Sequence, residues 1–111
     1  MMNPYDEAVV WIDRHPTTGS ATRLAKLLLS LWNADVKFSF RECVDSLDET
    51  RTDLAVRMVA HFARHGEDAD LQAAGERVCR DHPQLWELGN ARSDAQAALR
   101  QIWHAAPENQ A

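Results

Sequence analysis

The chain has 111 residues, enough for one domain with a hydrophobic core and too few for two domains of ordinary size. Hydrophobic residues make up 45% of it and charged residues 26%, a mixture that excludes an intrinsically disordered protein. The formal net charge is −5, and Lys26 and Lys37 are the only lysines. Proteins that bind nucleic acids neutralise phosphates with a basic surface, so this charge disfavours a nucleic-acid partner.

The first ten residues, MMNPYDEAVV, lack the basic start and apolar stretch of a secretory signal. We therefore expect a cytoplasmic protein in which Cys43 and Cys79 are reduced thiols. The most apolar stretch, Leu24 to Trp32, is much shorter than the roughly 20 apolar residues that cross a membrane, so no membrane contact is expected.

The first two predicted helices lie before residue 33. Asn3 caps a helix that has Pro4 in its first turn and ends near Arg14, ahead of Pro16. Its apolar face repeats at helical spacing in Tyr5, Ala8, Val9 and Ile12. TTGS opens the second helix. Leu24 to Trp32 is apolar over most of its circumference, which predicts a central core helix.

The middle of the chain predicts three more helices. Ser39 and Glu42 form a capping box, so a short helix is expected to run to about Leu47. A long helix follows over about 49–64 and ends at Gly66. A further helix spans about 68–81. The residues expected to be buried on these two longer helices are Leu54, Ala55, Met58, Val59, Phe62, Leu71, Ala74, Val78 and Cys79.

The C-terminal part predicts a break in the helical structure. Pro83 starts a short turn, QLWEL, that Gly89 stops. Ser93 and Gln96 form a second capping box that opens a last helix. This last helix is expected to bury Ala95, Ala98, Leu99, Ile102 and Trp103. The whole pattern predicts an all-α fold: one domain over 1–106, an irregular bundle of four longer helices plus one or two short helical turns, and a frayed tail at 107–111.

Titratable side chains suggest three kinds of site. His61 and His65, with Cys79 and His82, have spacings that a zinc ion accepts, but no paired C-x-x-C accompanies them. Cys43 or Cys79 with a histidine and a carboxylate could form a nucleophilic triad, yet no family-specific cysteine context supports it. The helix at 49–64 carries Arg51, Arg57 and Arg64, as a DNA-recognition helix does, among acidic neighbours. We expect no catalytic residue, metal or cofactor.

Four tryptophans are many for so short a chain. Trp32 and Trp103 lie on predicted core faces. Trp86 lies in the short turn after Pro83, and Trp11 at the edge of its helix face. Aromatic side chains in such positions are enriched at protein interfaces, so Trp86 and Trp11 are the candidate interface residues. The alternative for Trp86 is that it closes one end of the core.

Two segments carry a resemblance: TGSATRLAKLLLSLWNA and, after it, LDETRTDLAVRMVAHFARH. They resemble a family of small uncharacterised bacterial domains that share a G-x-x-x-R-x-A-x-x-L-L-x-x-W-N-A-like helix followed by an L-D-containing helix. The resemblance covers about residues 17–88. It implies a bacterial, cytoplasmic, helical protein of unknown function, of a kind that often accompanies mobile elements. It assigns no functional residues. The matching residues are Gly19, Arg23, Ala25, Leu28, Leu29, Trp32, Asn33, Ala34, Leu47 and Asp48.

The leading functional hypothesis is a small acidic module that acts by binding another protein, with a homodimer as one possible assembly. The alternative is a DNA-associated regulator with a helix-turn-helix-like element, and the second alternative is a metal-dependent or cysteine enzyme.

The core assignment of Leu24 to Trp32 is testable at its centre. Leu28→Ala should reduce the free energy of unfolding by roughly 2–5 kcal/mol, and Leu28→Asp should prevent folding. Urea denaturation followed by circular dichroism measures both. A Leu28→Asp variant with unchanged stability would place the segment on the surface.

Overall fold

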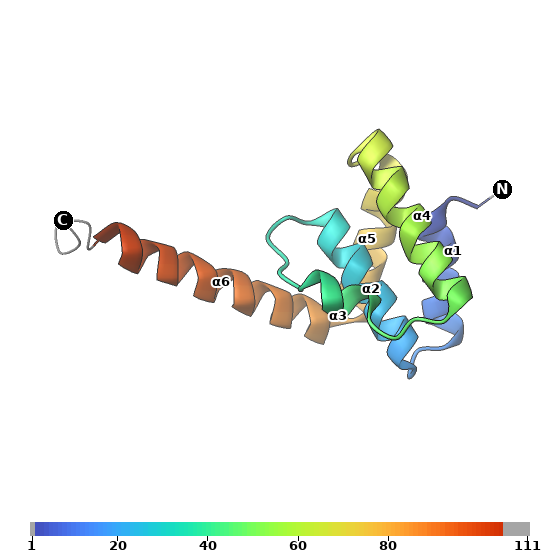
Figure 1. Ribbon diagram of the computed structural model, residues 1–111, viewed down its shortest axis with the longest axis horizontal. Coiled ribbons are helices and arrows are strands. Elements are labelled where there is room, and N and C mark those ends of the chain that lie inside the picture. The colour runs from blue at the N-terminus through green and yellow to red at the C-terminus, as the bar shows by residue number, and fades with distance from the viewer. Residues whose placement is uncertain (1, 106–111) are drawn as a thin grey trace.

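The computed structural model describes residues 2–105, which form six helices. Their bounds are α1 Pro4–Arg14, α2 Gly19–Trp32, α3 Phe40–Val44, α4 Glu49–His65, α5 Ala69–Asp81 and α6 Pro83–Ala105. The described residues contain no strand, so the predicted all-α class is confirmed. The first five helices form a bundle, and α6 projects from it (Figure 1), which gives the molecule extents of 56 × 30 × 26 Å. The tail predicted at 107–111 lies outside the described residues.

The predicted helix ends before residue 83 are mostly confirmed, and local side-chain hydrogen bonds explain them. The side chains of Asn3, Thr18, Asp48 and Asp68 each accept a backbone N–H in the first turn of the helix that follows. Ser39 and Glu42 form both bonds of the capping box, although α3 ends at Val44, earlier than expected. Gly66, with φ of 63°, caps α4 in a conformation that favours glycine.

Helix α2 is the centre of the core. Leu24, Leu28 and Leu29 are fully buried, as the sequence predicts. Helices α1, α3, α4 and α5 all pack on α2. Helix α4 contributes Leu54, Ala55 and Met58, and α5 contributes Leu71, Ala74 and Val78. The expectation that Val59 is buried is wrong, because its side of α4 is not covered by another helix and leaves Val59 exposed.

The predicted break at Gly89 is wrong, since Pro83–Ala105 is one continuous helix. Gly89 is buried inside α6, where the segment before α3 crosses the helix. The backbone N–H of Lys37 donates to the Gly89 carbonyl at 3.1 Å, and a Cβ at residue 89 would lie 2.5 Å from Val36. This glycine therefore permits a close approach of two backbones within a helix and does not end one.

The predicted burial of the last helix is also wrong. Beyond residue 93 every described residue is exposed, with Ile102 62% and Trp103 58% accessible. The five residues named as core on this helix, including Trp103, lie on the part of α6 that extends beyond the bundle (Figure 1). Only the first turns of α6 reach the core, through Leu85 and Trp86.

Gly75 of α5 allows a tight contact with α2. An added Cβ would lie 2.1 Å from Cγ of the Trp32 ring, whereas at Gly19 it would meet only the flexible end of Arg23. We predict that Gly75→Ala lowers the free energy of unfolding by about 1–3 kcal/mol, even though alanine favours a helix by roughly 1 kcal/mol over glycine. The matched variant Gly19→Ala should be neutral or stabilising. Equal denaturation midpoints for the two variants would contradict this.

Candidate functional site

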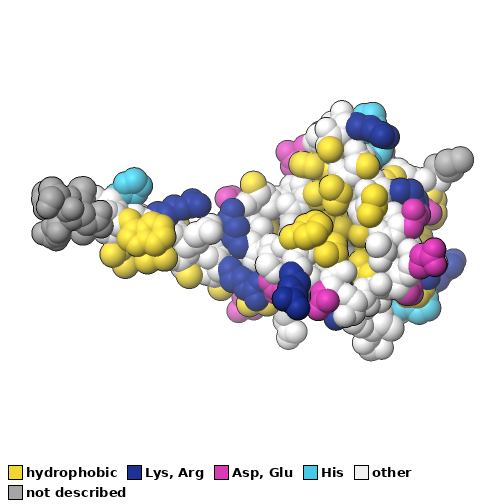
Figure 2. All heavy atoms as spheres, viewed as in Figure 1, with side chains coloured by type: hydrophobic (Ala, Val, Ile, Leu, Met, Phe, Trp, Pro, Cys, Tyr) yellow, Lys and Arg dark blue, Asp and Glu magenta, His cyan; other side chains and the backbone are white. Residues whose placement is uncertain are grey.

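The main hollow on the surface is an apolar groove between α3 and α4, with a volume of about 450 Å³. Figure 2 shows it as a continuous area of hydrophobic side chains on the face of the bundle. We call this surface the α3–α4 groove. Its lining residues are Phe40, Val44, Leu47, Thr52, Ala55, Val56, Val59, Ala60 and Ala63. A hollow of this size and apolar lining is typical of a binding site.

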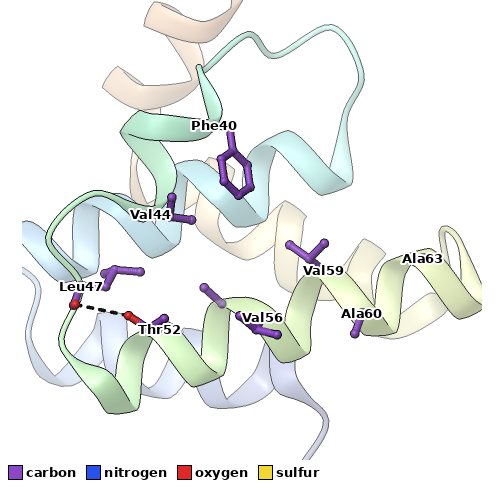
Figure 3. A pocket seen from close by; sticks show the side chains of 9 residues that line it. Phe40, Val44, Leu47, Thr52, Val56, Val59, Ala60 and Ala63 are labelled. Atoms are coloured by element: carbon purple, nitrogen blue, oxygen red, sulfur yellow. Dashed lines mark hydrogen bonds between the residues drawn. The ribbon is translucent and has the colours of Figure 1, made fainter.

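The two walls of the groove come from helices that both pack on α2 and have few contacts with each other. Phe40 is the first residue of α3, and the capping box at Ser39 fixes the direction in which this helix starts. Phe40 is 71% exposed and Val56 is 61% exposed. Figure 3 shows Phe40 and Val59 pointing into the space between the two helices. Large apolar side chains so exposed and so close together indicate a surface that binds another apolar element.

The groove offers no polar group to a ligand. Thr52 carries its only polar side chain, and the Thr52 hydroxyl donates to the backbone carbonyl of Leu47 at 3.3 Å (Figure 3). Binding in this groove therefore depends on the burial of apolar surface, and its specificity depends on shape and on charged groups outside the groove.

A network of charged groups centred on Glu42 joins α2, α3 and α6. The Glu42 carboxylate accepts from Arg92 of α6, from the Ser39 backbone, and from Lys26 of α2 at 3.3 Å. The hydrogen bond from Arg92, followed by that from Ser39, lowers the pKa of Glu42 to about 2. This network ties the start of α6 to α3.

The structure places the two tryptophans predicted as an interface outside the α3–α4 groove. The half-buried Trp86 ring packs against Trp32, with ring centroids 5.6 Å apart. The half-buried Trp11 ring lies against Arg51, whose guanidinium is 3.6 Å from the ring centroid, and against His15. Both rings have partners within the chain, and their part in an interface stays a prediction.

Of the histidines and cysteines named from the sequence, His61 and His65 lie together, with ring centroids 4.5 Å apart. His61 Nε2 lies 3.1 Å from Asp68 Oδ2 and its ring meets the edge of Tyr5. Within residues 2–105 no three His, Cys, Asp or Glu side chains gather as ligands of a metal would. Burial raises the pKa of both the Cys43 and the Cys79 thiol, the opposite of the change that activates a cysteine nucleophile. Burial, with Asp68 and Asp70, also raises the pKa of Tyr5 to about 12.

Two of the three arginines named for DNA binding already have partners. Arg57 pairs with Glu7 and Asp53, and Arg51 stacks on Trp11. In the described part of the chain no helix is long and apolar enough to cross a membrane.

Sequence reasoning missed Phe40, Val56 and Val59 as site residues. The sequence feature that could have revealed them is the width of the apolar face of α4. Val56 and Val59 lie beside the buried Ala55 and Met58 on this face, and both are exposed.

Comparison with protein-family models, curated proteins and solved structures gives no match to this chain. The resemblance to a bacterial family therefore stays a prediction, and the function rests on the geometry of the molecule.

The Glu42 network gives a pH prediction. A carboxylate whose pKa falls from 4.5 to about 2 on folding stabilises the folded state above pH 4.5, and this stabilisation is lost as the pH falls toward 2. Glu42→Gln should therefore reduce stability at pH 7, by roughly 1 kcal/mol for a partly exposed network. The difference from wild type should shrink between pH 4.5 and pH 2. Urea denaturation across this range measures it, and a difference independent of pH would contradict the assignment.

Proposed function

We propose that this protein is a protein-interaction module, and that the α3–α4 groove docks an amphipathic helix of a partner chain. The observation that carries the proposal is the exposure of Phe40, Val56 and Val59 around one hollow on an otherwise well-packed bundle. Exposure of a contiguous apolar surface to water is unfavourable, by roughly 25 cal/mol for each Å², so a partner that covers it gains free energy.

The shape of the groove favours a helix as the docked element. Its walls are one short helix and the side of a longer one, and its lining follows α4 from Thr52 to Ala63 (Figure 3). An extended peptide that binds by strand addition needs a free strand edge to pair with, and residues 2–105 contain no strand. A helix satisfies its own backbone hydrogen bonds and presents apolar residues at i, i+3, i+4 and i+7, which suits an apolar channel without polar groups.

The proposal is tested by selecting helical peptides from a library against the full-length protein and against its Val56→Asp variant. The selected peptides should share an apolar stripe at helical spacing and should lose at least about thirtyfold in affinity for Val56→Asp, since truncating a central apolar contact typically costs about 2 kcal/mol or more. Val56 is exposed, so this variant should keep the stability of the wild type.

The matched control is Thr50→Asp, an equal change of charge at an exposed position of α4 outside the groove. Affinity should be unchanged in this variant. Peptides that bind Val56→Asp as tightly as the wild type would overturn the proposal.

A further inference from the structure

The exposed large apolar side chains of the described chain fall on two surfaces. Apart from Met2, they belong either to the α3–α4 groove or to helix α6. On α6 they are Leu88, Leu99, Ile102 and Trp103. With Ala91, Ala95 and Ala98 between them, most of these residues line one side of the helix at spacings of three and four, and we call the run Leu88–Ile102 the α6 stripe.

The α6 stripe faces away from the bundle. The residues of α6 that meet the bundle are Leu85, Trp86 and the buried Gly89. At 3.6 residues per turn, Ala95 and Ile102 lie about 120–140° around the helix from Gly89. The stripe therefore lies on a different side of α6 from the residues that pack on the bundle. A longer contact between α6 and its own bundle would leave the stripe exposed.

The groove and the stripe of one molecule cannot meet. Helix α6 is continuous from Pro83 to Ala105, and Arg92 holds its first part against Glu42 of α3. From there α6 leads away from α4 (Figure 1). Closing the stripe onto the groove of the same chain would require breaking this helix.

From these observations we propose that the α3–α4 groove is filled by the α6 stripe of a second copy of this chain, reciprocally, in a two-fold symmetric dimer. This inference rests on the proposed function and names the partner of the same site. Each chain then contributes one helix and one groove, and every exposed large apolar residue other than Met2 and Trp103 lies on a surface that takes part in the contact. Figure 2 shows hydrophobic side chains on the bundle and on α6 in the same view, and in a two-fold dimer each chain presents the same two surfaces to its partner.

The two surfaces match in length. The groove lining on α4 runs from Thr52 to Ala63 and the denser part of the stripe from Ala91 to Ile102. Each spans eleven residue steps, or about 17 Å along a helix.

Charge also matches, and it sets the direction of the docked helix. Asp45, Asp48 and Glu49 are exposed beside Leu47 at one end of the groove. The outer half of α6 carries Asp94 nearer the bundle and Arg100 nearer its C-terminal end, in a chain whose net charge is −5. The C-terminal end of α6 is therefore expected at the Leu47 end of the partner's groove, where opposite charges favour correct docking.

Reciprocal docking also gives the larger interface. A stable dimer buries about 800 Å² on each partner. Pairing of two α6 helices alone makes one short contact and leaves both grooves open, whereas the reciprocal arrangement makes two helix–groove contacts.

The test uses the full-length chain and measures its mass in solution by sedimentation over a range of concentrations. Wild type should reach the mass of a dimer. Val56→Asp, in the groove, and Ile102→Asp, on the stripe, should each raise the dissociation constant at least about thirtyfold. Ala97→Asp, an equal charge change on the side of α6 away from the stripe, should leave it unchanged, and Thr50→Asp, which adds negative charge beside Asp48 and Glu49, should not raise it. Circular dichroism confirms that all four variants are folded.

Mixing the two disruptive variants separates reciprocal docking from other assemblies. The Ile102→Asp chain retains an intact groove and the Val56→Asp chain an intact stripe, so the mixture should form a heterodimer through one contact, more tightly than either variant alone. A monomeric wild type, or a Val56→Asp variant that dimerises like wild type while Ile102→Asp does not, overturns the inference; the latter result indicates α6–α6 pairing. If the wild type is monomeric and selected peptides still bind the groove, this inference fails and the proposed function stands.

Discussion

The burial of α2 on most of its sides is the constraint on which the rest of this structure depends. Helices α1, α3, α4 and α5 surround it, and its leucines form the centre of a single core. Four helices occupy most of the circumference of this fourteen-residue helix, which leaves little of its apolar surface for a sixth. Only Leu85 and Trp86 of α6 reach the core, with Trp86 against Trp32, the last residue of α2.

Both uncovered surfaces follow from this arrangement. Helix α3 has five residues and packs on α2, so it is too short to cover the neighbouring side of α4. Val56 and Val59 are therefore left beside Phe40 in an open groove. Helix α6 leaves the bundle after its first turns, and its outer half has no core to pack on. The same crowding around α2 thus creates a concave apolar surface and a convex one in a single chain.

The charged groups around the bundle fix how the helices are oriented relative to one another. Glu42 connects three helices and holds α6 at Arg92, while Arg57 and Arg77 connect α1 to α4 and to α5. Exposed ion pairs of this kind contribute little to stability one at a time. Their effect here is on orientation, because the direction of α6 decides whether its apolar stripe is directed toward the bundle or away from it.

The sequence by itself determined the all-α class, the central helix at Leu24 to Trp32 and most helix ends before residue 83. These features depend on local interactions, since a cap is made within four residues and an amphipathic face repeats along one helix. Only the tertiary structure decided the role of Gly89 and the exposure of Ile102 and Trp103. From local sequence alone, a glycine is expected to end a helix. Gly89 instead allows the backbone at Lys37, which is distant in sequence, to approach α6 closely. An apolar stripe along a helix predicts that this side of the helix packs against another apolar surface. Whether that surface belongs to the same chain depends on how many helices already pack on α2.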